Sequence, residues 1–446
     1  MNWRAALSII PGFKAVEPVK ALPPWYQNTI VLAALGLSLA VYLFENYVSL
    51  RQYFRLHQKD IPASIKTIIK PDEFEKARLY SLDKCSFGLL VGAIDFVLEI
   101  YILIALYPIL WSYSGTVSAK YLSAASEIHQ SLVFGGLLMV LSTIISIPSS
   151  LYMTFVIEAR HGFNKQTIGL FFGDLVKSLI LGSVFGGVAL AATISIVRRF
   201  GDKFVVALWL FIMGLQFFLL LIFPTFIQPL FNKFEPLAEG SLKSKIEALA
   251  RRLSFPLSKI FVMDGSKRSS HSNAYFFGFI SKRIVIFDTL MAQNTEDEIC
   301  AVLGHELGHW KHGHTWQMLI FSQLQIIGLF YAFSHFYRNE KIFEAFGYGN
   351  QQPVLIGLLL FAAFYKPINL VVSFLLHLLS RHNEFQADRF SVSLGYGKLL
   401  QSSLTKLQIE NKGNMNPDWL YSALHYQHPP LVQRLEAIDA AMRKNN

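Results

Sequence analysis

The sequence predicts a polytopic α-helical membrane protein that carries one small α+β domain. Of its 446 residues, 53% are hydrophobic and only 16% are charged, whereas about a quarter of the residues in soluble domains are charged. Seven apolar stretches are long enough to cross a bilayer. A metal-binding helix motif lies in the one sizeable polar segment between these stretches.

Composition and charge exclude several classes of protein. The only two cysteines, Cys85 and Cys300, exclude a disulfide framework and a cysteine-rich zinc site, and we expect both to be buried thiols. The net charge of +10 does not indicate nucleic-acid binding, because the basic residues lie mostly in loops beside apolar spans. Retention of those loops on the cytosolic side of a membrane explains the charge better.

The apolar stretches predict seven transmembrane spans, of which the first is the weakest because Glu45 closes it early. We expect the spans at about 27–45, 86–111, 131–157, 167–197, 204–230, 315–336 and 353–380. They divide the chain into 1–230 with five spans and a cytosolic loop at 48–85, a soluble insert at 231–314, two further spans at 315–380, and a C-terminal segment at 381–446.

The basic residues predict the orientation of these spans. The loop after the first span carries eight of them between Arg51 and Lys84, whereas the loop after the second has only Lys120. The first loop is therefore expected in the cytosol, and parity places the insert and the C-terminal segment there too. Three basic residues fall on the opposite side: Arg198, Arg199 and Lys203.

The soluble insert combines helical and strand patterns. We expect a helix at Leu242–Leu253, strands at Lys259–Met263 and Arg283–Phe287, and an edge strand at Asn273–Phe279. Thr295 followed by Glu298 forms a capping-box pattern that begins the next helix, and that helix continues toward the sixth span.

This helix carries the motif His305-Glu306-Leu307-Gly308-His309. Residues four apart share one face of a helix, so two imidazoles at this spacing can bind one Zn²⁺ while Glu306 reaches the metal-bound water. The alternative is a helix with ordinary polar residues and no metal. It stays open because roughly one random chain in a hundred would contain the pattern by chance.

Catalytic zinc takes three protein ligands. His312 lies on the same helical face but about 10 Å along the axis from His305, too far to share one ion, and we expect His312 and His314 to face water or headgroups. Glu384 is the better third ligand, because spans six and seven form a hairpin that returns the chain to the same membrane face.

Asp388 lies one turn beyond Glu384 and can orient a ligand histidine through its other ring nitrogen. The alternative for this segment is a surface helix with two acids beside Arg381 and Arg389.

Four segments together resemble the type I CAAX prenyl endopeptidases, which are integral-membrane zinc metalloproteases of the endoplasmic reticulum and inner nuclear membrane. The segments are HELGH, NEFQAD, RSSHSNAYF at 268–276 and HYQHPPL at 425–431. The resemblance covers most of the chain, and its motifs are strongest from about Phe231 onward. It implies a gluzincin-like protease domain above about seven helices that enclose a water-filled chamber.

The resemblance also implies roles for individual residues. It makes His305, His309 and Glu384 the zinc ligands, with one zinc per chain, and Glu306 the catalytic base. It places His428 near the scissile carbonyl and makes Arg434 a structural partner of the site. The substrate-side segment is Asn273, Ala274 and Tyr275. Without the resemblance, His428 reads as part of a loop stiffened by two prolines, and Asn273–Tyr275 as an ordinary edge strand.

The implied activity is removal of the C-terminal tripeptide from prenylated, in particular farnesylated, CAAX proteins, with a second upstream cut in some substrates. Zinc would acidify its bound water and polarise the peptide carbonyl, Glu306 would move the proton, and His428 would donate to the oxyanion. The expected location is the endoplasmic reticulum or inner nuclear membrane, with the site facing the cytosol and with membrane lipid, not nucleic acid, as a partner.

Two alternatives remain at this stage. One is a protease of stalled or misfolded membrane proteins. The other is a transporter, suggested by charged residues within the spans, which are costly there and usually face a cavity or a partner. These residues are Asp95, Glu99, Asp174 and Lys177.

Overall fold

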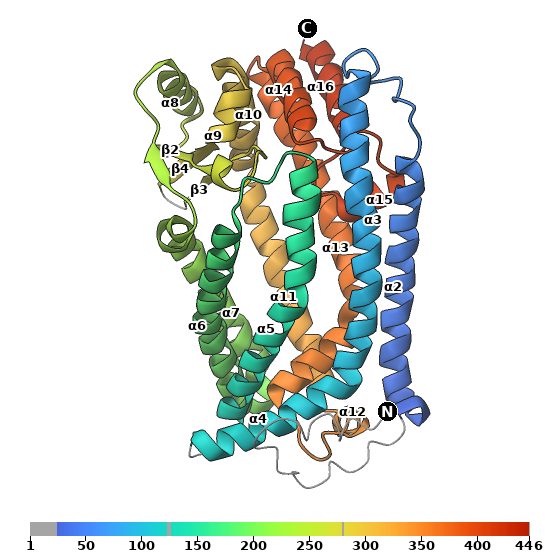
Figure 1. Cartoon of the computed structure of the whole chain (residues 1–446). Helices are drawn as coiled ribbons and strands as arrows, with labels where there is room; N and C mark the ends of the chain where they lie inside the picture. The colour runs from blue at the N-terminus through green and yellow to red at the C-terminus, as the bar shows by residue number, and fades with distance from the viewer. Residues whose placement is uncertain (1–24, 123–125, 279–280, 446) are drawn as a thin grey trace.

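The computed structural model describes residues 25–122, 126–278 and 281–445. Long helices run side by side, and a small sheet with short helices lies at the end where the C-terminus is found (Figure 1). The long helices are α2 (Thr29–Leu56), α3 (Pro71–Tyr101), α4 (Tyr107–Tyr121), α5 (Glu127–Tyr152), α6 (Ile168–Phe200), α7 (Phe204–Ile222), α11 (His314–Tyr337) and α13 (Val354–Ser393). The shorter helices are α8 (Ser241–Leu253), α9 (Asp288–Gln293), α10 (Glu296–Lys311), α12 (Glu340–Ala345), α14 (Gly397–Glu410), α15 (Trp419–His425) and α16 (Leu431–Asn445). The strands are β1 (Phe234–Pro236), β2 (Leu257–Met263), β3 (Ala274–Phe277) and β4 (Lys282–Phe287).

Six continuous helical stretches in the described residues are long and apolar enough to cross a membrane. One of them, Ile168–Leu230, has 63 residues, far more than the about 20 that a bilayer requires. It consists of α6 and α7, which pack against each other as a hairpin. Gly201 between them adopts φ +48°, a conformation that favours glycine. Counting α6 and α7 separately gives the seven predicted spans.

The helices extend further than the hydropathy pattern predicts. The stretch 48–85, expected as a loop, is helical over most of its length, because α2 continues to Leu56 and α3 begins at Pro71. The side chains become polar where a helix leaves the membrane, but the backbone hydrogen bonds of a helix do not depend on apolar side chains. The helix can therefore continue beyond the apolar stretch. Several basic residues of this stretch therefore lie on helix ends.

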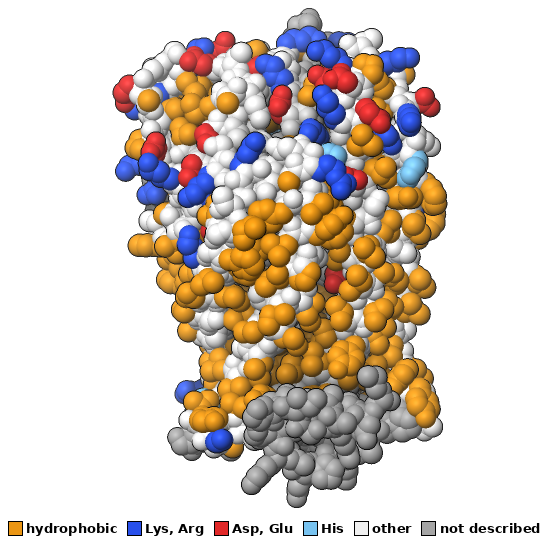
Figure 2. All heavy atoms as spheres, in the orientation of Figure 1, with side chains coloured by type: hydrophobic (Ala, Val, Ile, Leu, Met, Phe, Trp, Pro, Cys, Tyr) orange, Lys and Arg blue, Asp and Glu red, His pale blue; other side chains and the backbone are white. Residues whose placement is uncertain are grey.

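The spans alternate in direction, so the turn between α2 and α3, the turn between α5 and α6, and the sheet all lie at one end (Figure 1). Hydrophobic side chains form a broad band around the helices, and charged side chains gather at the end with the sheet (Figure 2). Only 6% of the most apolar window of Pro71–Tyr121, and of Ile168–Leu230, is buried inside the protein. Almost all side chains in these two windows therefore keep some accessible surface.

The small sheet has the strand order β1-β2-β4-β3. β2 and β4 are parallel, whereas β3 runs antiparallel to β4 and is an edge strand. The predicted helix at 242–253 and strands at 259–263 and 283–287 are confirmed, and the edge strand is shorter than predicted. Residues of α8, the sheet and α10 share one core, including Ile246, Ile284, Ile286 and Leu303. This core fixes α10 against the sheet.

Candidate active site

Helix α10 holds the metal-binding motif and begins where the sequence predicts. The hydroxyl of Thr295 accepts a hydrogen bond from the Glu298 backbone N–H at 3.3 Å, and the Glu298 carboxylate accepts one from the Thr295 N–H at 2.8 Å. Glu298 also accepts hydrogen bonds from Lys406 and Ser402 of α14. These partners lower the pKa of Glu298 to about 2 against the opposing effect of burial.

Glycines on α10 allow α13 to approach it closely. A Cβ atom on Gly308 would lie 3.0 Å from the Ala387 Cα and 3.2 Å from its carbonyl oxygen. A Cβ on Gly304 would lie 3.2 Å from the Ser391 hydroxyl. Since Glu384 lies one turn before Ala387 on α13, this close approach brings Glu384 to the two histidines of α10.

The structure brings His305, His309 and Glu384 together, with one donor atom from each within 4.8 Å of the others. The two Nε2 atoms are 3.2 Å apart, and the Glu384 oxygens lie 3.5 Å from Nε2 of His305 and 3.2 Å from Nε2 of His309. Donors bound to one tetrahedral Zn²⁺ at about 2.0–2.1 Å are roughly 3.4 Å apart. The residues present therefore fit a zinc ion.

Glu384 has an unsatisfied oxygen, which points to the same conclusion. Its Oε2 is buried and has no hydrogen-bond partner in the described residues, although Nδ1 of His428 lies 2.8 Å away and Nη1 of Arg434 lies 3.5 Å away. A buried carboxylate oxygen without a partner is costly, and a bound cation would remove that cost.

Asp388 and Arg434 lie behind His305. Nδ1 of His305 is 2.9 Å from Oδ1 of Asp388. Arg434 donates to both oxygens of that carboxylate, from Nη2 at 2.6 Å and from Nε at 2.9 Å. This buried network fixes the ring so that its Nε2 faces Glu384 and His309.

His314 is the partner of His309, and the sequence prediction for it is wrong. It is only 6% exposed, its Nδ1 lies 2.9 Å from Nδ1 of His309, and its Nε2 lies 2.9 Å from the Gln386 side-chain oxygen. Gly313 adopts φ +68° between α10 and α11 and turns His314 back toward the site. His312 is exposed, as expected. The glycine before His314 is the only sequence signal that could have indicated this turn.

Glu306 lies between the two histidines of the motif. Burial raises its pKa above the usual range of a glutamate, and the neighbouring histidines partly oppose the rise. His428 comes from the loop between α15 and α16 and is well exposed, with 67% of its side chain accessible. Glu306 and His428 therefore supply a carboxyl and an imidazole beside the metal donors.

The segment Asn273–Tyr275 begins the edge strand, which packs against α10. Asn273 is exposed and Ala274 is buried, and the outer edge of β3 has no strand partner among the described residues. The Tyr275 hydroxyl accepts a hydrogen bond from Gln228 at 2.7 Å. Tyr275 thus ties β3 to the end of the α7 span, while the strand edge stays free beside the metal helix.

Three of the four charged residues of the spans, Glu99, Asp174 and Lys177, have charged partners. Arg268, shortly before β3, donates to both oxygens of Asp174 on α6, at 2.8 and 3.0 Å, and Lys177 lies 3.6 Å from the same carboxylate. Glu99 forms an ion pair with Lys366 of α13 and lines a cavity together with Asp95. Asp174 and Lys177 thus take part in pairing between elements, whereas Asp95 and Glu99 line a cavity.

Comparisons with known proteins agree with this geometry. Residues 51–233 match the family model of the CAAX prenyl protease N-terminal region with five membrane helices, and residues 236–442 match peptidase family M48. The chain is 46% identical to a CAAX prenyl protease 1 homolog of Arabidopsis thaliana, over 94% of this chain and 99% of that protein. It is 41% identical to CAAX prenyl protease 1 of Saccharomyces cerevisiae, over 92% and 95% of the two chains. The crystal structure of S. mikatae Ste24p matches with a TM-score of 0.87 and 40% identity, over 94% and 99% of the two chains. The chain therefore belongs to peptidase family M48, in the branch with the CAAX prenyl protease N-terminal region, and is a multi-pass membrane metallopeptidase.

Proposed function

We propose that this metallopeptidase is a zinc-dependent endopeptidase that removes the C-terminal tripeptide from prenylated CAAX proteins. The observation that carries the proposal is the group formed by His305, His309 and Glu384, with Glu306 beside it, at one end of a membrane bundle. The substrate class is supported by the relatives named CAAX prenyl proteases. Some substrates would receive a second, upstream cut.

The two histidines and Glu384 would hold the zinc ion. Imidazole and carboxylate donors suit Zn²⁺, and their separations of 3.2–3.5 Å suit tetrahedral bonding. When bound, zinc would lower the pKa of a water molecule and polarise the scissile carbonyl. Asp388 and Arg434 would keep Nε2 of His305 directed at the ion.

The protein groups would then move the proton and hold the substrate. The Glu306 carboxylate takes a proton from the attacking water and passes it to the leaving amine nitrogen. An N–H of His428 donates to the oxyanion, a contribution of about 3 kcal/mol in comparable sites. Asn273, Ala274 and Tyr275 offer the strand edge to an extended peptide.

We further propose that the protein lies in the membrane of the endoplasmic reticulum or in the inner nuclear membrane, with lipid around the spans and with the sheet end facing the cytosol. The basic residues at the ends of α2 and α3 support this orientation. The working division of the chain is 1–230, 231–314, 315–380 and 381–446.

The test is cleavage of matched farnesylated and unprenylated CAAX peptides by the purified protein, with metal content measured in parallel. We expect preferential cleavage of the farnesylated peptide, one zinc per chain, and a Glu306→Gln variant that keeps its metal but loses at least 100-fold in rate. Equal cleavage of both peptides would favour the broader protease of membrane proteins. An active protein without zinc, or an active Glu306→Gln variant, would contradict the proposal.

A further inference from the structure

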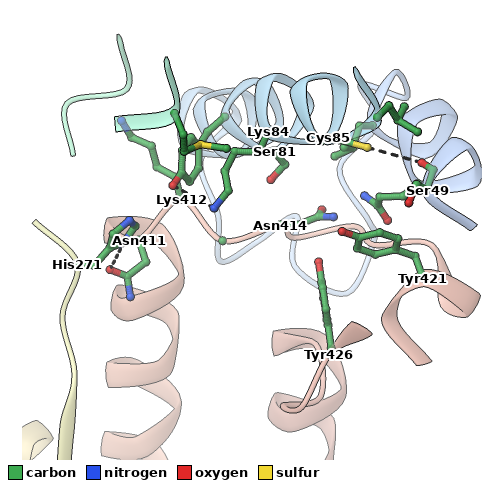
Figure 3. A pocket seen from close by; sticks show the side chains of 17 residues that line it. Ser49, Ser81, Lys84, Cys85, His271, Asn411, Lys412, Asn414, Tyr421 and Tyr426 are labelled. Carbon is green, nitrogen blue, oxygen red and sulfur yellow. Dashed lines mark hydrogen bonds between the residues drawn. The ribbon is translucent and has the colours of Figure 1, made fainter. Parts of the chain in front are cut away.

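A polar cavity lies beside the lead-in to β3, separate from the metal donors. Its volume is about 480 Å³. It is lined by residues of α2, α3, the segment before β3, the loop after α14 and the approach to the His428 loop. In Figure 3, Lys84 on α3 faces the loop that carries Asn411, Lys412 and Asn414, with His271 on one side and Tyr426 on the other. His271 lies two residues before Asn273, and Tyr426 two residues before His428.

The cavity is positively charged. Lys84 and Lys412 line it, and none of its lining residues is an aspartate or glutamate. A neighbouring cavity of about 550 Å³ is instead lined by Glu45, Asp95 and Glu99 with one lysine. The two cavities share Ser49, Gly88 and Leu89, so a change from acidic to basic lining occurs within a short distance.

Neither lysine forms an ion pair with a described residue. Nζ of Lys84 donates to the Tyr80 hydroxyl at 3.3 Å. Lys412 donates to the His161 carbonyl and lies over the Phe163 ring, 4.9 Å from its centroid. Of the nearby carboxylates, Glu158 lies behind the cavity wall, where it accepts from Tyr80 at 2.6 Å and lies 3.6 Å from Nε2 of His271. Asp83 pairs with Arg160 and His161.

The loop that presents Lys412 is held in place. Lys412 has φ +46°, a left-handed conformation that is unfavourable for a non-glycine residue. Oδ1 of the preceding Asn411 accepts from the Ser272 backbone N–H at 3.2 Å and lies 3.2 Å from Nδ1 of His271. The loop is therefore bonded to the lead-in of β3. Burial lowers the pKa of Lys412, as does the nearby charge of Lys76, while Glu410 opposes the change.

The direction of β3 indicates which end of a peptide would reach this cavity. β3 runs from Ala274 to Phe277 and already pairs antiparallel with β4. A peptide that adds to its free edge in the same antiparallel manner runs the opposite way, so its C-terminus points toward Asn273 and His271. A strand advances about 3.3 Å per residue, so the end of a three-residue leaving group lies roughly 10 Å beyond the scissile bond.

We propose that this cavity binds the terminal α-carboxylate of the substrate, with Lys84 and Lys412 as the cations that attract it and the Asn411 and Asn414 amides as further donors. The proposal rests on the proposed function and deepens it. A fixed anchor for the carboxylate sets the distance from the chain end to the reacting atoms, and so selects a tripeptide as the leaving group. An upstream cut, far from any chain terminus, does not use this anchor.

The experiment compares farnesylated CAAX peptides that end in a free carboxylate or in a carboxamide. The zinc-loaded full-length protein is placed in nanodiscs of zwitterionic lipid, so that no anionic headgroup competes. We expect the amide to lose roughly ten- to a hundredfold in kcat/KM, as for a lost charge-assisted hydrogen bond. In the Lys84→Gln and Lys412→Gln variants, kcat/KM for the carboxylate peptide should fall toward the value for the amide peptide. The Lys84→Arg variant should recover part of the preference for the carboxylate.

The matched control is Lys398→Gln, which removes the same charge from the exposed opposite end of α14 and should keep the wild-type preference. Equal cleavage of both peptides by the wild type would overturn the carboxylate site while leaving the CAAX activity intact, and this comparison needs no variant to fold. Lysine variants that slow both peptides equally would also overturn it, because they would show a structural role. If the wild type cleaves neither farnesylated peptide, the proposed function itself fails.

Discussion

At the scale of single residues, the metal donors depend on neighbours that contribute no donor atom. Gly308 contributes no side chain, and for that reason α13 can approach α10 closely enough for Glu384 to reach the histidines. His314 is buried against His309 and is held in turn by Gln386. The geometry of the site is thus built from packing and hydrogen bonds around the donors.

We predict that Gly308→Ala lowers both stability and zinc binding. The added methyl would lie 3.0 Å from the Ala387 Cα, so α13 would have to move, at a cost of about 1–3 kcal/mol. Thermal unfolding and zinc titration would measure the two effects. Gly328→Ala, at a helical position with nothing within 4 Å, should be neutral or slightly stabilising. Equal behaviour of the two variants would show that the close contact is unimportant.

We predict that His314→Ala weakens zinc affinity about 10- to 100-fold, because His309 loses the ring that orients it. Competition with a chelator of known affinity would measure the change. His312→Ala removes an exposed imidazole two residues away and should leave the affinity unchanged. A wild-type affinity in His314→Ala would mean that His309 needs no orienting partner.

At the scale of elements, α10 is anchored at its first turn as well as at its metal face. Glu298 closes the capping box and is buried against Lys406 and Ser402 of α14. The helix that carries the motif is therefore connected to the C-terminal helices before the metal donors are reached. The soluble insert and the C-terminal segment are far apart in the sequence, and residues of both stabilise α10.

This anchor predicts a pH-dependent stability. The pKa of Glu298 is about 2 in the folded protein, below its ordinary value of 4.5. Its contribution is therefore fully present above pH 4.5 and is lost as the pH falls toward 2. Thermal unfolding should show Glu298→Gln less stable than wild type at pH 7, by about 1–3 kcal/mol, with the difference shrinking below pH 4.5. Asp297→Asn, at an exposed acid in the same turn whose side chain is 60% accessible, should change little at either pH.

Sequence reasoning succeeded for this protein where a local pattern is sufficient. The capping box, the spacing of His305 and His309, and the β-branched runs of β2 and β4 each act within a few residues, and the structure has them all. The prediction of a loop at 48–85 was wrong, because α2 and α3 continue beyond their apolar stretches. Hydropathy indicates which residues contact lipid and does not indicate where a helix ends. The placement of His314 also escaped prediction, because it depends on the backbone conformation of Gly313. The cavity beside β3 combines segments that are far apart in the sequence, and hydrophobic periodicity does not indicate which segments meet.

At the scale of the whole molecule, ion pairs join the membrane bundle to the protease part. Arg268, before β3, bonds to Asp174 on α6. Arg51 near the end of α2 donates to both oxygens of Asp418 at the start of α15. These contacts connect the spans to the two segments that lead to β3 and His428. The position of the substrate-side elements thus depends on the bundle.

We predict that Asp174→Asn destabilises the protein by about 1–3 kcal/mol, because it leaves the partly buried Arg268 without its counter-charge. It should also raise KM for peptide substrates if β3 shifts with Arg268. Unfolding in detergent and steady-state kinetics would measure both. Asp202→Asn breaks the exposed pair with Arg338, in which the aspartate is 84% exposed, and should have little effect. Equal effects of the two substitutions would show that the interdomain pair has no special role.

Helix α13 extends without a break over 40 residues, about 60 Å, whereas the hydrocarbon core of a bilayer is about 30 Å thick. Its lower part lies among the spans, and its upper turns carry Glu384 and Asp388. A thinner or thicker bilayer tilts or strains a helix that crosses it. Pro367 lies in the membrane part of α13 and removes one of its backbone hydrogen bonds, and the helix that continues beyond it carries a change of tilt to the carboxylate at its far end. Reconstitution in lipids of graded acyl-chain length should therefore change the rate of hydrolysis, so that membrane thickness itself tunes the enzyme.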